Sequence, residues 1–359
     1  MPCALWILIA SKRAELTNIS TGETMINKVC SVFLLTISFF VLFFSPEITL
    51  SSDNVYKVGL QDRIFAVHFL DRRNGWVVGD GGVILSSKDG GKTWKQLITA
   101  WENSFNDVTF VGKRGWIVGD RGIILHTEDG GDVWERQESH CQASLMAVDF
   151  IDGKRGVAIG QQMVLWTEDG GLRWQPSPLD WEAILPEALI ERGVISPNLY
   201  DLFFLDETRG WMVGDNGMVF ISYNLGKHWE LLSIGMYPPL YSVFFKNKQE
   251  GFAAGQGGTL LHTKDGGKTW RNLSLPTEKN LFKIKLTGDY GVAAGDLGTI
   301  LQTSNGGKTW KLLPLALRPP PPWFLDVSLI MSDTSVKAIC VGEGIIREIS
   351  IPASSSLAN

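Results

Sequence analysis

The chain has 359 residues, of which 44% are hydrophobic and 20% are charged. This composition excludes an intrinsically disordered chain and allows a large buried core. The formal net charge of -5 gives no support to a nucleic-acid binder, because such domains are usually strongly basic. The 39 glycines follow no collagen period, so they indicate many tight turns and many short strands.

One strongly apolar segment runs from Val32 to Phe44, after Lys28 and before Ser45-Pro46. It is short for a membrane span, which needs about 20 residues, and it fits the apolar region of a secretory signal peptide. Met25 offers a second start codon and a shorter leader than Met1. The alternative is an uncleaved N-terminal anchor over Val29 to Leu50, which would associate the protein with the membrane. Both interpretations predict an exported chain, periplasmic or lumenal.

From residue 64 onward the chain repeats one pattern six times. Its first copy reads Trp76-Val77-Val78-Gly79-Asp80, then Val83-Ile84-Leu85, then the box Asp89-Gly90-Gly91-Lys92-Thr93-Trp94. The boxes of the six copies end at Trp94, Trp134, Trp174, Trp229, Trp270 and Trp310. A period near 40 residues with strand-like content is typical of β-propeller blades.

Each copy predicts four short strands separated by glycine-rich turns. In the first copy these are Ala66 to Leu70, Trp76 to Gly79, Val83 to Ser87 and Trp94 to Leu97. A seventh copy lacks the box and offers only three strands, at 325–330, 336–341 and 345–349. The segment at 55–58 would supply the missing fourth strand and cover the open sheet edges.

The predicted fold is therefore all-β, a seven-bladed β-propeller closed by an N-terminal strand. The domains are a signal peptide or anchor with a short linker over residues 1–52, the propeller over 53–351 and a disordered tail over 352–359. The largest blade connection, Gln175 to Pro197, contains a predicted short helix over Trp181 to Arg192, broken near Pro186.

The composite repeat G-W-x-V-G-D-x-G-x-I-L-x-T-x-D-G-G-x-T-W resembles the repeat of the photosystem II stability and assembly factor family. The resemblance covers nearly the whole chain after the leader. It implies a lumenal or periplasmic seven-bladed propeller, without enzymatic activity or cofactor, that binds a subunit of a membrane protein complex. A monomer is expected.

The D-G-G-x-T-W box alone is the less specific Asp-box, which also occurs in sialidases, endoglucanases and sorting receptors. Its recurrence in six blades favours a structural role over a catalytic one. The boxes begin at Asp89, Asp129, Asp169, Asn224, Asp265 and Asn305.

Basic residues recur in the turn between the first two strands of four adjacent blades. This basic arc consists of Arg72, Arg73, Lys113, Arg114, Lys154, Arg155 and Arg209. The family resemblance implies an arginine patch that binds the protein partner, and these residues match it by type and turn. Such an arc would attract an acidic partner or lipid head groups, although solvated turn charges explain it equally well.

On the opposite face the turn between strands two and three carries an aspartate in four blades. These aspartates are Asp80, Asp120, Asp215 and Asp296. Local hydrogen bonds within each turn explain them better than a calcium site, because propeller geometry holds the turns apart. No metal site is predicted.

Two other functions stay open. A sialidase-like glycoside hydrolase would hold a substrate carboxylate with arginines such as Arg63, Arg121 and Arg318, although Arg63-Ile64-Phe65 does not meet the R-I-P signature. A carbohydrate-binding module would stack sugar rings on Trp101, Trp166 and Trp181. The leading prediction is the assembly factor that binds protein.

Overall fold

The structure is a computed structural model that describes residues 55–57, 63–191, 193–194, 197–234, 237–332 and 335–351. The chain divides into two compact units, Met1–Ser51 and Ser52–Asn359. Only the second unit contains described residues, so the predicted leader and the predicted C-terminal tail lie outside them. No described helix is both long enough and apolar enough to cross a membrane.

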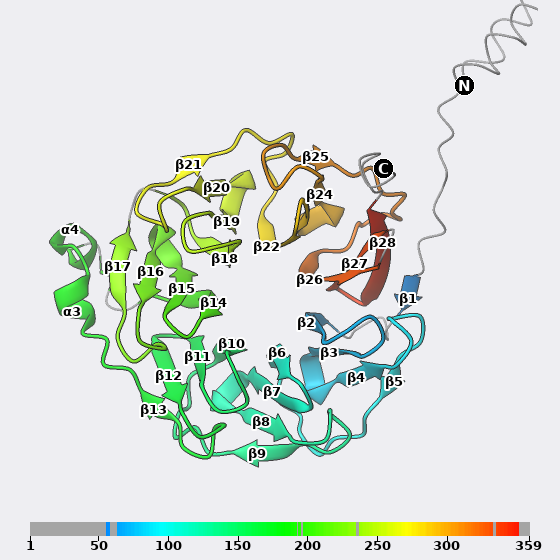
Figure 1. The fold of residues 1–359 in the computed structure, drawn as a ribbon, viewed down its shortest axis with the longest axis horizontal. Helices are drawn as coiled ribbons and strands as arrows, with labels where there is room; N and C mark the ends of the chain where they lie inside the picture. The colour runs from blue at the N-terminus through cyan, green and yellow to red at the C-terminus, as the bar shows by residue number, and fades with distance from the viewer. Residues whose placement is uncertain are drawn as a thin grey trace, which may run out of the picture. The chain divides into compact units, whose positions relative to one another are not determined.

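Seven four-stranded antiparallel sheets form a ring, which confirms the predicted seven-bladed propeller (Figure 1). Blades 1 to 6 each use four consecutive strands, from the axis outward. Blades 1 to 3 comprise β2 (Ile64–Phe69), β3 (Gly75–Gly79), β4 (Ile84–Ser87) and β5 (Lys95–Gln96); β6 (Phe105–Val111), β7 (Arg114–Gly119), β8 (Ile124–Thr127) and β9 (Glu135–Gln137); and β10 (Leu145–Phe150), β11 (Gly156–Gly160), β12 (Met163–Thr167) and β13 (Gln175–Pro176). Blades 4 to 6 comprise β14 (Leu199–Asp206), β15 (Arg209–Gly214), β16 (Val219–Ser222) and β17 (Glu230–Ser233); β18 (Leu240–Phe245), β19 (Gly251–Gly255), β20 (Leu260–Thr263) and β21 (Arg271–Asn272); and β22 (Leu281–Thr287), β23 (Tyr290–Gly295), β24 (Ile300–Thr303) and β25 (Lys311–Leu312).

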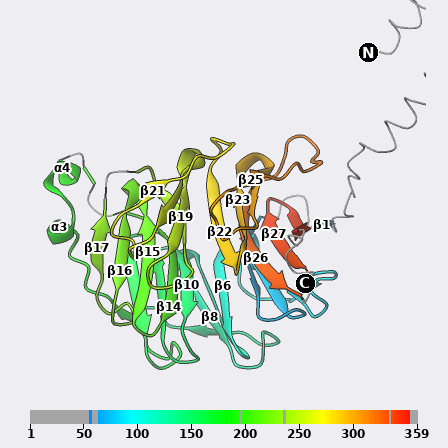
Figure 2. The same ribbon diagram turned by 45° about the horizontal axis from the view of Figure 1, so that its top comes forward.

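Blade 7 closes the ring with strands from both ends of the propeller. Its sheet order is β1-β28-β27-β26, formed by β26 (Phe324–Met331), β27 (Val336–Gly342), β28 (Ile345–Ile351) and β1 (Val55–Lys57). Val55 lies opposite Arg347 and Lys57 lies opposite Ile345 in an antiparallel pair. The predicted closure by an N-terminal strand is confirmed, and Figure 2 shows β1 beside the C-terminal strands.

The strand boundaries differ slightly from those predicted. The first strand of blade 1 begins at Ile64, two residues before the predicted Ala66, and the fourth begins at Lys95 instead of Trp94. Trp94 belongs to the preceding turn, because its indole Nε1 donates to the Gly91 carbonyl at 3.0 Å. Trp94 therefore closes its turn before the outer strand begins, and Trp134 and Trp310 make the same bond in their boxes.

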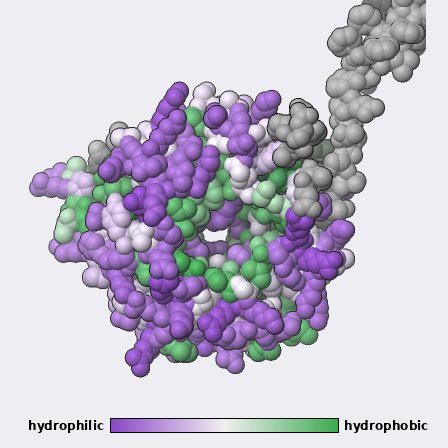
Figure 3. All heavy atoms as spheres, viewed as in Figure 1, coloured by the Kyte–Doolittle hydropathy of each residue, from purple (hydrophilic) through white to green (hydrophobic). Residues whose placement is uncertain are grey.

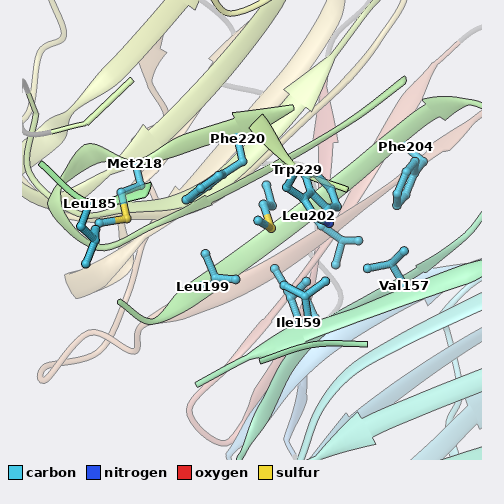
Figure 4. Close-up of a cluster of buried hydrophobic side chains, with 12 residues drawn as sticks. Val157, Ile159, Leu185, Leu199, Leu202, Phe204, Met218, Phe220 and Trp229 are labelled. Atoms are coloured by element: carbon cyan, nitrogen blue, oxygen red, sulfur yellow. The ribbon is translucent and has the colours of Figure 1, made fainter. Parts of the chain in front are cut away.

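The hydrophobic core is divided among the seven interfaces between neighbouring blades. Figure 4 shows the interface of blades 3 and 4, where Val157 and Ile159 from β11 face Leu202 and Phe204 from β14. Leu185, from the long connection between these blades, joins the same cluster. Because each cluster takes side chains from two sheets, a blade buries its apolar faces only when both neighbours are present.

Aromatic contacts link several Asp-boxes to the blade before them, as blades 2 and 3 show, whereas the boxes of blades 1 and 4 meet Ile339 and Val157. Trp116 of β7 is fully buried and stacks on Phe150 of β10, with ring centroids 3.5 Å apart and planes 8° apart. The Trp116 Nε1 also donates to the carbonyl of Gly170 in the next Asp-box at 3.0 Å. Trp174, from that box, meets Phe150 edge-on. The repeated tryptophans thus join blades as well as closing turns.

The second glycine of the Asp-box makes room for the preceding blade. Gly131 has a φ of 85°, which favours glycine. A Cβ built at Gly131 would lie 2.4 Å from the Trp76 Nε1 of blade 1. Any other residue there would push the two blades apart.

The turn between the second and third strands is a short 3-10 turn in five blades. These turns are η1 (Asp80–Gly82), η2 (Asp120–Gly122), η3 (Asp215–Gly217), η4 (Gln256–Gly258) and η5 (Asp296–Gly298). The long connection forms two single-turn helices, α3 (Trp181–Ile184) and α4 (Glu187–Ile190), separated at Pro186. The Asp180 carboxylate caps α3 by accepting from the Ala183 amide at 3.2 Å.

Candidate functional site

The basic arc lies on one face of the disc, at the turns that follow the innermost strands of blades 1 to 4. We call this the arc face; the 3-10 turns and the blade-to-blade connections form the opposite face. Arg72, Arg73, Lys113 and Lys154 are exposed, whereas Arg114, Arg155 and Arg209 are half-buried. The seven residues therefore fall into two groups.

The three half-buried arginines reach from one blade to the next. Arg114 of blade 2 donates from Nη1 to the Gly153 carbonyl at 2.9 Å and from Nε to Glu128 at 2.8 Å. Arg209 of blade 4 donates from Nη1 to the Lys248 carbonyl of blade 5 at 2.9 Å. These side chains hold neighbouring turns in register, so a partner meets them already fixed in place.

Arg155 is paired with carboxylates from two blades. Its guanidinium forms ion pairs with Asp152 in its own turn at 2.6 Å and with Glu207 of blade 4 at 2.8 Å. Hydrogen bonds from Arg155 lower the pKa of Glu207, and both carboxylates raise the pKa of Arg155. Because its charge is already compensated, Arg155 adds less to the field of the arc than exposed Lys113 or Lys154.

A cavity of about 190 Å³ lies at the blade 4 end of the arc. Arg209, Tyr223, Gln249 and Lys268 are among the side chains that line it. The guanidinium carbon of Arg209 stands 5.5 Å from the centroid of the Tyr223 ring, and its buried Nε has no hydrogen-bond partner among the described residues. A carboxylate is the group that a guanidinium donor of this kind binds best.

The Asp-box side chains are occupied by bonds within their own turns. The Asp265 carboxylate accepts from the Thr263 hydroxyl at 2.8 Å and from the Thr269 amide at 2.9 Å. Hydrogen bonds from Thr269 lower the pKa of Asp265. In the other five boxes, too, the Ser or Thr hydroxyl at the end of the third strand donates to the first side chain of the box. These acceptors are Asp89, Asp129, Asp169, Asn224 and Asn305.

Two aspartates of the opposite face, Asp80 and Asp120, accept hydrogen bonds from outside their own turns, whereas the sequence predicted bonds within each turn. The Ser104 hydroxyl, from the connection into blade 2, donates to Asp80 of blade 1 at 2.8 Å. The Ser144 hydroxyl donates in the same way to Asp120 at 2.7 Å. Two of these carboxylates therefore join neighbouring blades. Within the described ranges, no three histidine, cysteine, aspartate or glutamate side chains meet in a way that could hold a metal ion.

The innermost strands carry charged side chains that the repeat pattern alone does not single out. They line the central channel and comprise Asp107, Asp149, Asp201, Lys283, Lys285 and Asp326. The Lys283 Nζ lies 3.0 Å from Asp201 and 4.0 Å from Asp326, so one cation from blade 6 faces carboxylates of blades 4 and 7. The sequence does mark these residues, because each is a charged residue at the third or fifth position of a mostly apolar inner strand.

The channel aspartates also bind the backbone of the following blade. Asp107 accepts from the Val148 amide at 2.8 Å, and Asp326 accepts from the Val67 amide at 2.8 Å. Burial raises the pKa of Asp107 to about 7, partly offset by the charge of Lys283. In the folded protein the Asp107 carboxyl is therefore neutral at pH 5, and its ionisation above pH 7 lowers the stability of the fold.

Replacing Asp107 by asparagine is expected to stabilise the propeller at pH 8 by at least about 1 kcal/mol. The amide oxygen still accepts from Val148, and the poorly solvated charge is gone. A raised folded-state pKa means that the folded protein binds more protons than the unfolded chain between pH 4 and 7, so wild-type stability falls as pH rises through this range. Urea unfolding at pH 5 and pH 8 checks this: the stability difference between the two proteins should be larger at pH 8 than at pH 5. An equal difference at both values would contradict it.

These observations define a closed β-propeller scaffold that carries the basic arc on one face of its disc. The chain belongs to the family described as Photosynthesis system II assembly factor YCF48, which it matches over residues 46–143 and 221–328, together more than half of its length. No curated protein matches the sequence.

Solved structures resemble the propeller at low identity. A structure of YCF48 bound to a D1 peptide is 21% identical, with a TM-score of 0.67, and the match covers 85% of this chain and 99% of that one. YCF48 from Cyanidioschyzon merolae is 17% identical, with a TM-score of 0.66 and coverages of 83% and 98%. A xyloglucanase of family GH74 from Xanthomonas campestris is 13% identical, with a TM-score of 0.61, and covers 82% of this chain but 53% of its own. At these identities the likeness supports the fold alone.

Proposed function

We propose that the chain is an exported, non-enzymatic assembly or stability factor for photosystem II that binds a segment of a membrane subunit of that complex. The observation that carries the proposal is the family match over more than half of the chain. A similar propeller, YCF48, has been solved with a D1 peptide bound, and its fold corresponds to 85% of this chain. A D1 peptide is therefore the first ligand to test.

The basic arc is the surface that we assign to this partner. Its exposed members stand on adjacent blades, while the half-buried arginines fix the turns that carry them. The cavity beside Arg209 adds a guanidinium suited to a carboxylate at one end of the arc. Electrostatic complementarity of this kind acts chiefly through the association rate and the choice of partner.

Reversing the charges of Arg73, Lys113 and Lys154 to glutamate should weaken capture of a synthetic D1 peptide by at least about tenfold. These three side chains are exposed, so the ring should keep its thermal unfolding midpoint. Surface plasmon resonance at 50 and 150 mM salt measures the loss, which should shrink at the higher salt because screening weakens exposed charges.

The matched control reverses Lys264, Lys308 and Lys311, which are exposed in the Asp-box turns of blades 5 and 6 or at the start of the outer strand that follows. It changes the net charge by the same amount at another place. Equal weakening by both triple variants would mean that net charge alone matters. Unchanged capture by the Arg73, Lys113 and Lys154 variant would remove the arc from the binding site.

Export rests on the apolar segment Val32 to Phe44, which lies outside the described residues. Fractionation of the source cells, with N-terminal sequencing of the recovered protein, distinguishes a cleaved leader from an uncleaved anchor. Recovery in the cytoplasm would overturn the exported location.

The glycosidase alternative gains no specific support from the described geometry. Arg63, Arg121 and Arg318 are exposed on three separate segments, and none of them lines the cavity beside Arg209 or the central channel. A fluorogenic sialoside assay is the direct test, and turnover abolished by changing Arg63 would favour that function over the scaffold.

A further inference from the structure

The central channel opens on the face opposite the basic arc through a ring of seven side chains. Each is the second residue of an innermost strand, and together they are Phe65, Asn106, Met146, Tyr200, Tyr241, Phe282 and Leu325. They line a cavity of about 100 Å³ above Asp107, Asp201, Lys283 and Asp326. Figure 3 shows the opening at the centre of the disc, with apolar residues around it.

One side of this opening is an aromatic wall that spans blades 4 to 6. Tyr200 meets Tyr241 edge-on with ring centroids 5.4 Å apart, and Tyr241 lies 5.6 Å from Phe282. Trp323, in the connection to blade 7, continues the wall 5.7 Å from Phe282 and is 41% exposed. Four rings in a row at a solvent opening form a surface rich in π electrons, which attracts cations.

Carboxylates stand behind and below this wall. The Tyr200 hydroxyl donates to Asp215 at 2.7 Å, and the charges of Asp215 and Asp296 both act on the Tyr241 hydroxyl. Asp296 differs from Asp215, because its buried Oδ1 has no hydrogen-bond partner among the described residues. At the floor lie the carboxyl groups of Asp107, Asp201 and Asp326 and the ammonium of Lys283.

We propose that this aromatic opening binds a lysine or arginine side chain presented by a partner polypeptide. The row of aromatic rings and the neighbouring carboxylates of Asp215 and Asp296 both favour a cation, and the cavity has room for one side-chain head but not for a folded element. The opening and the basic arc lie on opposite faces, so a partner segment that inserts a basic side chain here leaves the arc free for the acidic or carboxylate-bearing segment proposed above. The inference goes beyond the proposed function and does not depend on it.

The test uses two short peptides that differ only in charge, Ac-Gly-Gly-Arg-Gly-Gly-NH2 and its citrulline analogue, with the full chain. Isothermal titration calorimetry and saturation-transfer NMR should show binding of the arginine peptide at least about tenfold tighter than that of the citrulline peptide. Citrulline keeps the shape and most of the hydrogen bonds of arginine but lacks its positive charge.

Two variants of the wall carry the test further. Tyr241→Leu with Phe282→Leu should weaken the arginine peptide by about tenfold, and Asp296→Asn should weaken it by a smaller factor. Leu172→Ala, at an exposed apolar residue of the blade 3 Asp-box, is the control and should bind as wild type. Thermal unfolding midpoints verify that each variant is folded, and a second pair, Tyr241→Phe with Phe282→Tyr, keeps the rings and should retain binding.

Several outcomes would overturn the proposal. They are equal binding of the arginine and citrulline peptides, no binding of either, tighter binding of a glutamate peptide of the same length, and undiminished binding by the folded leucine variant. Binding of an oligosaccharide that competes at the opening, with no preference for the cationic peptide, would assign the aromatic wall to sugar rings instead.

Discussion

Replacing Lys283 by methionine is expected to lower the free energy of unfolding by about 3–5 kcal/mol at pH 7.5. The side chain is only 15% exposed and lies 3.0 Å from Asp201 and 4.0 Å from Asp326. Methionine fills much of the same volume, so the loss reports the charge and not a cavity. Without the cation, poorly solvated carboxylates of blades 2, 4 and 7 face one another across the axis.

The loss should shrink as the pH falls towards 5. Burial raises the pKa of Asp326 and of Asp107, and removing a nearby cation raises both further. A carboxyl with a raised folded-state pKa binds protons on folding, so the variant gains stability as pH falls through those pKa values. Burial and the charge of Lys285 lower the pKa of His68 to about 4, so His68 stays neutral between pH 5 and 8.

Urea unfolding of wild type and variant at pH 5, 6, 7 and 8 measures this difference. Lys311→Met, on the exposed outer strand β25, removes the same charge without touching the channel and should change stability by less than about 1 kcal/mol. If the Lys283 variant lost no more stability than this control, the channel charges would be solvated and the ring would not depend on them. A loss that did not change with pH would mean that packing, and not charge, is responsible.

The ring itself could be predicted from the sequence because its repeat is local. The Asp-box residues Asp89, Gly91 and Trp94 bond within one turn, so their spacing alone indicates the hairpin. Closure was also predictable, because a seventh copy with three strands leaves one sheet position that an N-terminal segment can fill.

The channel charges were harder to predict because they meet only after the ring closes. Asp201 and Lys283 are 82 residues apart and belong to non-adjacent blades. Side-chain alternation does not by itself identify the residues that face the axis, because a β-bulge between Ile64 and Ala66 interrupts it at the start of the inner strand. The bonds of Arg114 and Arg209 to the next blade were not predicted either, because nothing in the sequence of a turn indicates which residue of the neighbouring blade a charged side chain will contact.

The aromatic contacts between blades should matter as much as the charges at the axis. Replacing Trp211 of β15 by alanine is expected to cost about 3–5 kcal/mol of unfolding free energy. The ring is fully buried, stacks on Phe245 of blade 5 with centroids 3.5 Å apart, and donates from Nε1 to the Gly266 carbonyl at 2.9 Å. Trp211→Phe keeps much of the stacking and loses the hydrogen bond, so it should cost less than the alanine variant.

Guanidinium unfolding followed by tryptophan fluorescence and by far-UV circular dichroism measures the loss, with Tyr223→Ala at an exposed site as the control. An open repeat array would fray from the weakened interface, whereas a closed ring has no free end from which to unravel. Because β1 joins β28 and completes blade 7, we expect a single transition at a lower midpoint, coincident by both probes. Two separate transitions, or a cost no greater than that of Tyr223→Ala, would mean that the blades are held one by one and that closure does not make the propeller cooperative.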